Sequence, residues 1–129
     1  MYFDEKDYIM RMIKQMVRVL MSMLLGKKYI EVEIENENKY EVSGKKISDY
    51  KDMIDEGLIN EAENELLENI DYSKKDEVAV LVMLYDYIGM KSEEFLLQHR
   101  FSKQEVQDGL KRIADVMGYG EIAALLNDE

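Results

Sequence analysis

The sequence of 129 residues contains no cysteine and no proline. Without cysteine the chain forms no disulfide, no thiolate metal site and no cysteine nucleophile, and we expect a cytoplasmic location. The lack of proline is typical of a helical protein with few rigid turns. No segment has the roughly 18 uninterrupted apolar residues of a membrane span, because Arg11, Lys14 and Arg18 interrupt the longest candidate.

Recognisable catalytic motifs are also missing. His99 is the only histidine, so neither the di-iron pattern nor the two-histidine zinc protease pattern can form. There is no glycine-rich phosphate loop and no serine nucleophile elbow. The acids Glu61, Glu65 and Glu68 fall on one helical face, which we interpret as a solvated face. We therefore expect no enzyme, no catalytic residue, no cofactor and no metal, with a carboxylate-based hydrolase as a distant alternative.

Charge is unevenly distributed along a chain whose net charge is -11. Residues 1–8 carry -2, residues 9–28 carry +5 with no acid, and residues 29–129 carry -14. An acidic body repels a phosphate backbone, so we expect no nucleic-acid partner.

Four glycines divide the chain at regular distances. Gly26, Gly57, Gly89 and Gly118 each follow an apolar periodic run, where a left-handed helix cap is expected, and their separations of 31, 32 and 29 residues suit helix pairs. We predict one all-α domain over 1–129, formed by stacked antiparallel helical hairpins after a long N-terminal helix. The predicted helices cover 5–25, 47–56, 59–70, 74–88, 92–99 and 103–117, with a short last turn near 120–127.

Serines mark several predicted helix starts. The stretch "SKQE" from Ser102 to Glu105 matches a capping box, and Ser48, Ser73 and Ser92 are candidate simple caps. The run "VAVLVMLYDYI" at 78–88 is almost entirely apolar and predicts the central, most enclosed helix. Asp86 is its single acid, and must lie on a side that reaches water or a partner.

Residues 29–46 separate the N-terminal segment 1–28 from the helical body 47–129. Ile30, Val32 and Ile34 alternate with glutamates, which is typical of a half-buried strand, and "KYEV" could form the returning strand. A small β-hairpin at about 29–43 and an acidic flexible linker are both compatible with this composition.

The stretch "IMRMIKQMVRVLMSMLLG" at 9–26 contains five of the ten methionines. In helical projection its apolar arc spans roughly 200°, whereas a helix packed on one layer needs a little over 100°. Branched residues occupy the centre of this arc, and methionine dominates its two flanks. Because methionine suits exchangeable contacts, the flanks form our candidate interaction surface: Met10, Met12, Val19, Met21 and Met23.

Three interpretations of these flanks stay open. Other helices of the same domain could cover them, or a second copy or another protein could, with a homodimer as one form. The helix could also lie on an anionic membrane surface, with its cations toward the lipid. The leading hypothesis for function is a non-enzymatic protein-interaction or self-association module, and the alternative is a peripheral membrane protein.

At "DYIMRMIKQMVRVL" and "GLINEAENELLENI" the chain resembles an uncharacterised family of small helical bacterial proteins whose domain has no known function. That resemblance implies no activity, ligand or site residue. The second stretch is also similar to the first helix of a tetratricopeptide-type pair, with Ala62 as the small packing residue and Leu66 as its apolar partner. This similarity implies stacked helical hairpins, although no proline closes the pair and the glycine spacing is shorter than 34 residues.

Overall fold

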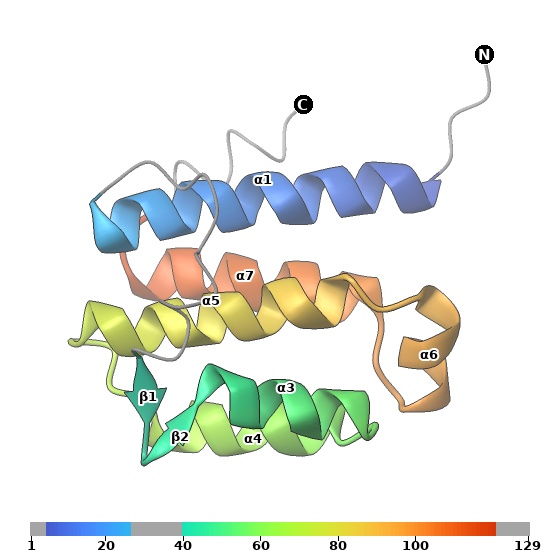
Figure 1. The fold of residues 1–129 in the computed structure, drawn as a ribbon. Coiled ribbons are helices and arrows are strands. Elements are labelled where there is room, and N and C mark those ends of the chain that lie inside the picture. Colours follow the sequence, from blue (N-terminus) through green and yellow to red (C-terminus); the bar gives the residue numbers. More distant parts are fainter. Residues whose placement is uncertain (1–4, 27–39, 121–129) are drawn as a thin grey trace.

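A computed structural model describes residues 5–26 and 40–120, and within them the chain forms six helices and one two-stranded sheet (Figure 1). The predicted all-α fold with a small hairpin is confirmed. The predicted last turn near 120–127 lies almost wholly outside the described residues. The elements are α1 (Glu5–Leu25), β1 (Glu41–Val42), β2 (Lys45–Lys46), α3 (Ile47–Asp55), α4 (Ile59–Asn69), α5 (Lys75–Gly89), α6 (Glu93–Gln98) and α7 (Lys103–Val116).

Helix α5 is the centre of the fold. It contacts α1 and α7 on one side and α3, α4 and β1 on the other (Figure 1). All residues from Val78 to Tyr85 are buried, which confirms that this run is the most enclosed helix. A helix that is apolar on all sides is stable only with neighbours all round, which explains why the other helices assemble around it.

Helix α1 packs against both α5 and α7. The centre of its apolar arc is buried, including Ile13, Val17 and Leu20 at 1 to 3 % exposure. Because two helices receive α1, its apolar arc is wider than a single neighbour would require. Most of the wide apolar arc of α1 therefore packs inside the domain.

A small hairpin is present at the end of the predicted range and just after it. Strand β1 pairs antiparallel with β2, with Glu41 opposite Lys46, so the described hairpin covers 41–46, and most of the predicted range 29–43 lies outside the described residues. The turn residues Ser43 and Gly44 both have positive φ angles, 54° and 81°, as a two-residue hairpin turn requires. The alternating stretch from Ile30 to Ile34 lies outside the described residues.

Three of the four glycines predicted to cap helices do follow a helix end. Gly26, Gly57 and Gly118 have positive φ and follow helices, as predicted. Gly89 does not: it is the last residue of α5 and is buried, and a Cβ atom there would lie 3.3 Å from Ile13 Cγ2. Its role is close packing against α1, so the prediction of a left-handed cap was wrong at this position.

Two of the four serine caps are confirmed. Ser92 Oγ accepts a hydrogen bond from the Phe95 backbone N–H, and Ser102 Oγ accepts one from the Glu105 N–H. Ser48 lies inside α3, where the Asp49 carboxylate instead accepts from the Lys46 N–H at 2.9 Å. Ser73 donates to Asp71, and α5 begins at Lys75. The predictions that Ser48 and Ser73 cap helices were therefore wrong.

Candidate interaction surface along helix α1

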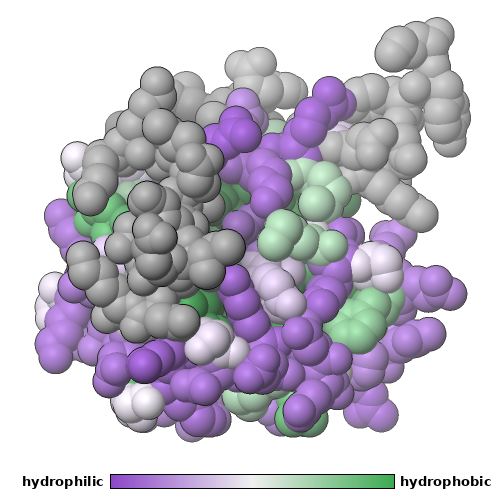
Figure 2. Space-filling model, in the orientation of Figure 1, coloured by the Kyte–Doolittle hydropathy of each residue, from purple (hydrophilic) through white to green (hydrophobic). Residues whose placement is uncertain are grey.

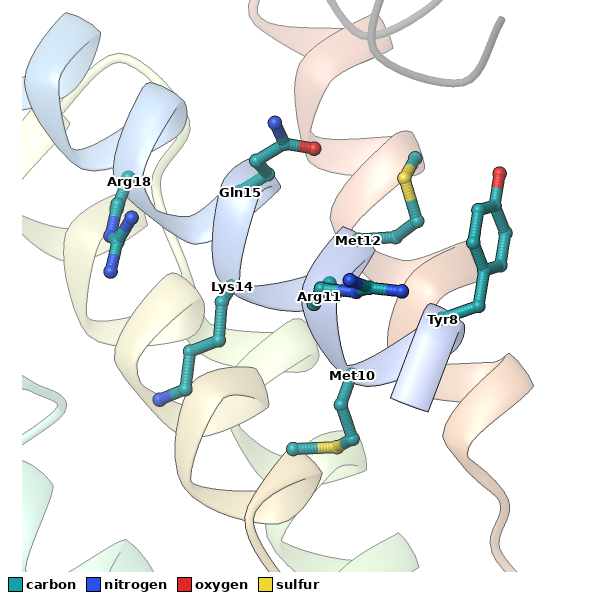
Figure 3. Close-up of a pocket in the computed structure, with 7 residues that line it drawn as sticks. All are labelled: Tyr8, Met10, Arg11, Met12, Lys14, Gln15 and Arg18. Carbon is teal, nitrogen blue, oxygen red and sulfur yellow. The ribbon is translucent and has the colours of Figure 1, made fainter. Parts of the chain in front are cut away.

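A hollow of about 620 Å³ lies along helix α1. The described residues that line it all belong to α1, and Figure 3 shows them spread along three turns of this helix. They are Tyr8, Met10, Arg11, Met12, Lys14, Gln15 and Arg18.

The helical repeat explains this grouping. Arg11, Gln15 and Arg18 are spaced four and three residues apart, so they share one face of α1, and all three are exposed. Met16 and Val17, on the opposite side, are buried in the core at 1 % exposure. The core thus fixes the rotation of α1 and directs the polar residues outward.

One cation of this surface is tied to the central helix. Lys14 Nζ lies 3.0 Å from Asp86 Oδ1, and the Asp86 side chain is only 17 % exposed. This pair provides a partner for the single acid of the apolar run 78–88. It also holds Lys14 at the edge of α1 nearest to α5.

The N-terminal end of the surface is fixed by Lys103 from α7. Its Nζ donates to the carbonyl oxygens of Gly89 at 2.7 Å and Lys91 at 2.6 Å, and lies 3.2 Å from Met10 Sδ. Lys103 therefore caps the C-terminal end of α5, where cations are favoured. Burial lowers the pKa of its ammonium group, and the nearby Glu93 opposes this shift.

The structure divides the five residues predicted as an interaction surface. Met12 and Met21 are buried, at 3 % and 1 % exposure, so as freely accessible contact residues they were predicted wrongly. Met21 belongs to the hydrophobic core to which α5 and α7 contribute. Met10, Val19 and Met23 are partly exposed. Of the five, only Met10 and Met12 line the hollow.

The polar half of the hollow was missed as a binding surface. From the sequence alone we assign Arg11, Lys14 and Arg18 no partner other than anionic lipid. Their spacing of three and four residues was the available signal, because it places all three along one side of a helix. What the sequence did not show is that Tyr8 and Met10 would continue this stripe with an aromatic and an apolar side chain.

Acidic residues elsewhere are engaged in structural contacts. Glu63 Oε2 accepts a 2.6 Å hydrogen bond from the hydroxyl of the buried Tyr85. Asp55 Oδ1 accepts from Lys91 Nζ at 2.6 Å and from the Tyr87 hydroxyl at 2.7 Å, and these bonds lower the Asp55 pKa. Within the described ranges no three histidine, cysteine or acidic residues come together as metal ligands.

His99 takes part in the packing of α6. Its Nδ1 lies 2.8 Å from the Phe95 carbonyl oxygen, and its ring lies 4.6 Å from that of Phe95. The other edge of the imidazole is so near Gly57 that a Cβ atom there would be 2.4 Å away. These contacts connect α6 to the turn between α3 and α4.

The described surface is mainly hydrophilic on the face shown in Figure 2, and its hydrophobic areas are small and separate. Large hydrophobic residues with more than half of their surface exposed are Met90, Leu97 and Val116. A partner that binds through charge together with a few apolar contacts therefore fits this surface better than one that needs a broad apolar patch.

Comparison with known proteins gives one match. Residues 3–118 match a group described as "Family of unknown function (DUF6483)". The chain belongs to this family. DUF6483 covers all of the described helices, and the predicted resemblance to a family without known function is confirmed. No curated protein and no solved structure matches the chain. Of the helices in the described part of the chain, none is long and apolar enough to span a membrane.

Proposed function

We propose that this DUF6483 protein is a non-enzymatic interaction module, whose basic α1 surface binds an acidic, partly apolar segment of a protein partner. The observation that carries the proposal is the hollow of about 620 Å³ beside Arg11, Lys14 and Arg18, in a chain of net charge -11. We further expect the protein to act in the cytoplasm, on the basis of its lack of cysteine.

Charge supports the acidic character of the partner. The part of α1 from residue 9 onward carries Arg11, Lys14 and Arg18 and no acid, while residues 29–129 carry -14, so this part of α1 attracts an anionic segment. Such complementarity guides a partner to one surface and disfavours binding elsewhere on the acidic body. Tyr8 and Met10 add apolar contact area next to the cations, as mixed interfaces commonly require.

The surface is held in place before a partner arrives. The buried side of α1 packs on α5 and α7, the Lys14–Asp86 pair joins two helices, and Lys103 fixes the position of Met10. A surface on a rigid helix loses less conformational entropy on binding than a loop does. The arrangement therefore favours recognition by a preformed surface.

Membrane binding has less support. A helix that lies on a membrane inserts its apolar face among the lipids. In α1 that face includes Ile13, Val17 and Leu20, which are buried in the core. Lipid insertion would require α1 to leave α5 and α7, exposing the most apolar helix of the protein to water.

A binding experiment separates these functions. The probe is a fluorescent synthetic peptide that forms an amphipathic helix, with glutamates spaced four and three residues apart next to leucines. The full chain is compared with the double variant Gln15→Glu/Arg18→Glu, which changes two exposed residues of the hollow. The control, Lys75→Glu/Gln98→Glu, makes the same change in formal charge at exposed positions on α5 and α6.

We expect the wild type and the control to bind the peptide with similar affinity, and the α1 variant to bind about tenfold more weakly or worse. Equal loss in both variants would show that only net charge matters and would contradict the proposal. Flotation with vesicles of phosphatidylcholine and phosphatidylserine is the second arm. Strong vesicle binding that the α1 variant loses, without peptide binding, would replace the proposal by the membrane alternative.

A further inference from the structure

Helix α4 presents an acidic stripe on its outer side. Glu61 and Glu68 are exposed and Glu65 is partly exposed, whereas Ile59, Ala62 and Leu66 on the inner side are fully buried. The three glutamates are spaced four and three residues apart, so they lie along one face. This stripe is the acidic counterpart of the cations on α1.

The two stripes have matching spacings when the helices run antiparallel. In this orientation Glu61 meets Arg18, Glu65 meets Lys14, and Glu68 meets Arg11. In each stripe the first and last charges are seven residues apart, which corresponds to about 10.5 Å along a helix. The positions of the charges along the two helices therefore match, and the outer pair of Glu61 with Arg18 does not depend on the intramolecular contacts of Lys14 and Glu65.

Within one molecule the stripes cannot meet, because α1 and α4 lie on opposite sides of α5 (Figure 1). We propose that the acidic segment recognised by the α1 surface is α4 of a second copy of this chain. This inference rests on the proposed function, since it identifies the partner of the same surface. Charge complementarity and the shared spacing of the two stripes both favour it.

The contact has a consequence for assembly. It joins two different surfaces, so each pair of molecules leaves one α1 surface and one α4 stripe open to further copies. The product is a chain that lengthens with concentration, and not a closed two-fold dimer. Lys14 and Glu65 already have partners in Asp86 and Lys45, so the pair of Glu61 with Arg18 contributes most to the affinity.

Sedimentation equilibrium of the full chain at low ionic strength tests this inference. We expect the average mass of the wild type to rise with protein concentration, and to rise less at high salt, where surface charges are screened. Gln15→Glu/Arg18→Glu and Glu61→Gln/Glu68→Gln are each expected to raise the dissociation constant about tenfold or more. Lys75→Glu/Gln98→Glu is the control and is expected to associate like the wild type.

Mixing the two interface variants gives the sharper result. The α1 variant keeps its acidic α4 stripe, and the α4 variant keeps its basic α1 surface, so an equimolar mixture should form dimers and stop there. A wild type that stays monomeric at all concentrations would overturn the inference, while binding of the acidic peptide would leave the proposed function standing. If only the α1 variant changes association, the acidic partner surface is not α4 and the inference fails.

Discussion

Lys14 and Asp86 join α1 to the central helix α5 through a contact of 3.0 Å between Nζ and Oδ1. Asp86 is the only acid in the otherwise apolar run 78–88, and Lys14 is one of the cations beside the hollow. A single pair thus satisfies a carboxylate that is mostly buried and sets the position of the interaction surface.

Removal of this pair should destabilise the fold moderately. Asp86→Asn keeps the shape of the side chain but removes its charge, so we expect the free energy of unfolding to fall by about 0.5–1 kcal/mol. Asp52→Asn, at an exposed position of α3, is the matched control and should have little effect. Urea unfolding followed by circular dichroism measures both. Equal stability of Asp86→Asn and the wild type would show that the contact contributes nothing to the fold.

Gly109 in α7 should not tolerate alanine. Alanine normally stabilises a helix interior by up to about 1 kcal/mol relative to glycine. Here, however, a Cβ atom would lie 2.4 Å from Tyr85 Cζ, and Tyr85 is completely buried. We expect Gly109→Ala to lower the free energy of unfolding by about 1–3 kcal/mol. Tyr85→Leu in the same chain should make the alanine less harmful. A thermal midpoint of Gly109→Ala above that of the wild type would contradict this packing.

Stability should decline at alkaline pH because of two buried tyrosines. Burial, with the charges of Glu65 and Asp49, raises the pKa of Tyr50 to about 12. Burial and the hydrogen bond to Glu63 raise the pKa of Tyr85. A tyrosine in the unfolded chain ionises near about pH 10. The folded state therefore favours the protonated phenols. The stability that they contribute is fully present below about pH 10 and is lost as the pH rises toward the pKa values of the folded state.

The double variant Tyr50→Phe/Tyr85→Phe checks this effect. Both hydroxyl groups are absent from this variant. Between roughly pH 9 and pH 11.5, where tyrosine ionises, its free energy of unfolding should therefore change less than that of the wild type. The measurement is denaturant unfolding at several pH values. Parallel pH curves for the two proteins would assign the alkaline loss to other groups.

Much of the fold could be predicted from the sequence because local patterns determine it. Helical periodicity and turn residues set the helix boundaries within one or two residues, and the apolar run 78–88 correctly indicated the central helix. The errors arise where tertiary contacts decide. Gly89 resembles a helix cap in the sequence but packs against Ile13. At the start of α3 the side chain of Asp49, and not that of Ser48, accepts a backbone hydrogen bond.

The candidate surface was harder to predict for the same reason. Helical projection identified the surplus width of the apolar arc, but not that α1 would pack against both α5 and α7 or that Met12 and Met21 would be buried. Helical projection also placed the cations and the methionines on different sides of the helix. Only the packing of Lys103 against Met10 and of Lys14 against Asp86 shows how the polar and apolar residues combine into one surface.

The central claim, that the outward side of α1 binds an acidic helix, is tested most directly by nuclear magnetic resonance. The full chain is labelled with nitrogen-15 and titrated with the acidic amphipathic peptide. We predict that the backbone amide signals of Arg11, Gln15 and Arg18 shift with peptide concentration, and that those of Lys75 and Gln98 stay in place. Shifts confined to other helices, or no shift at all, would contradict the account.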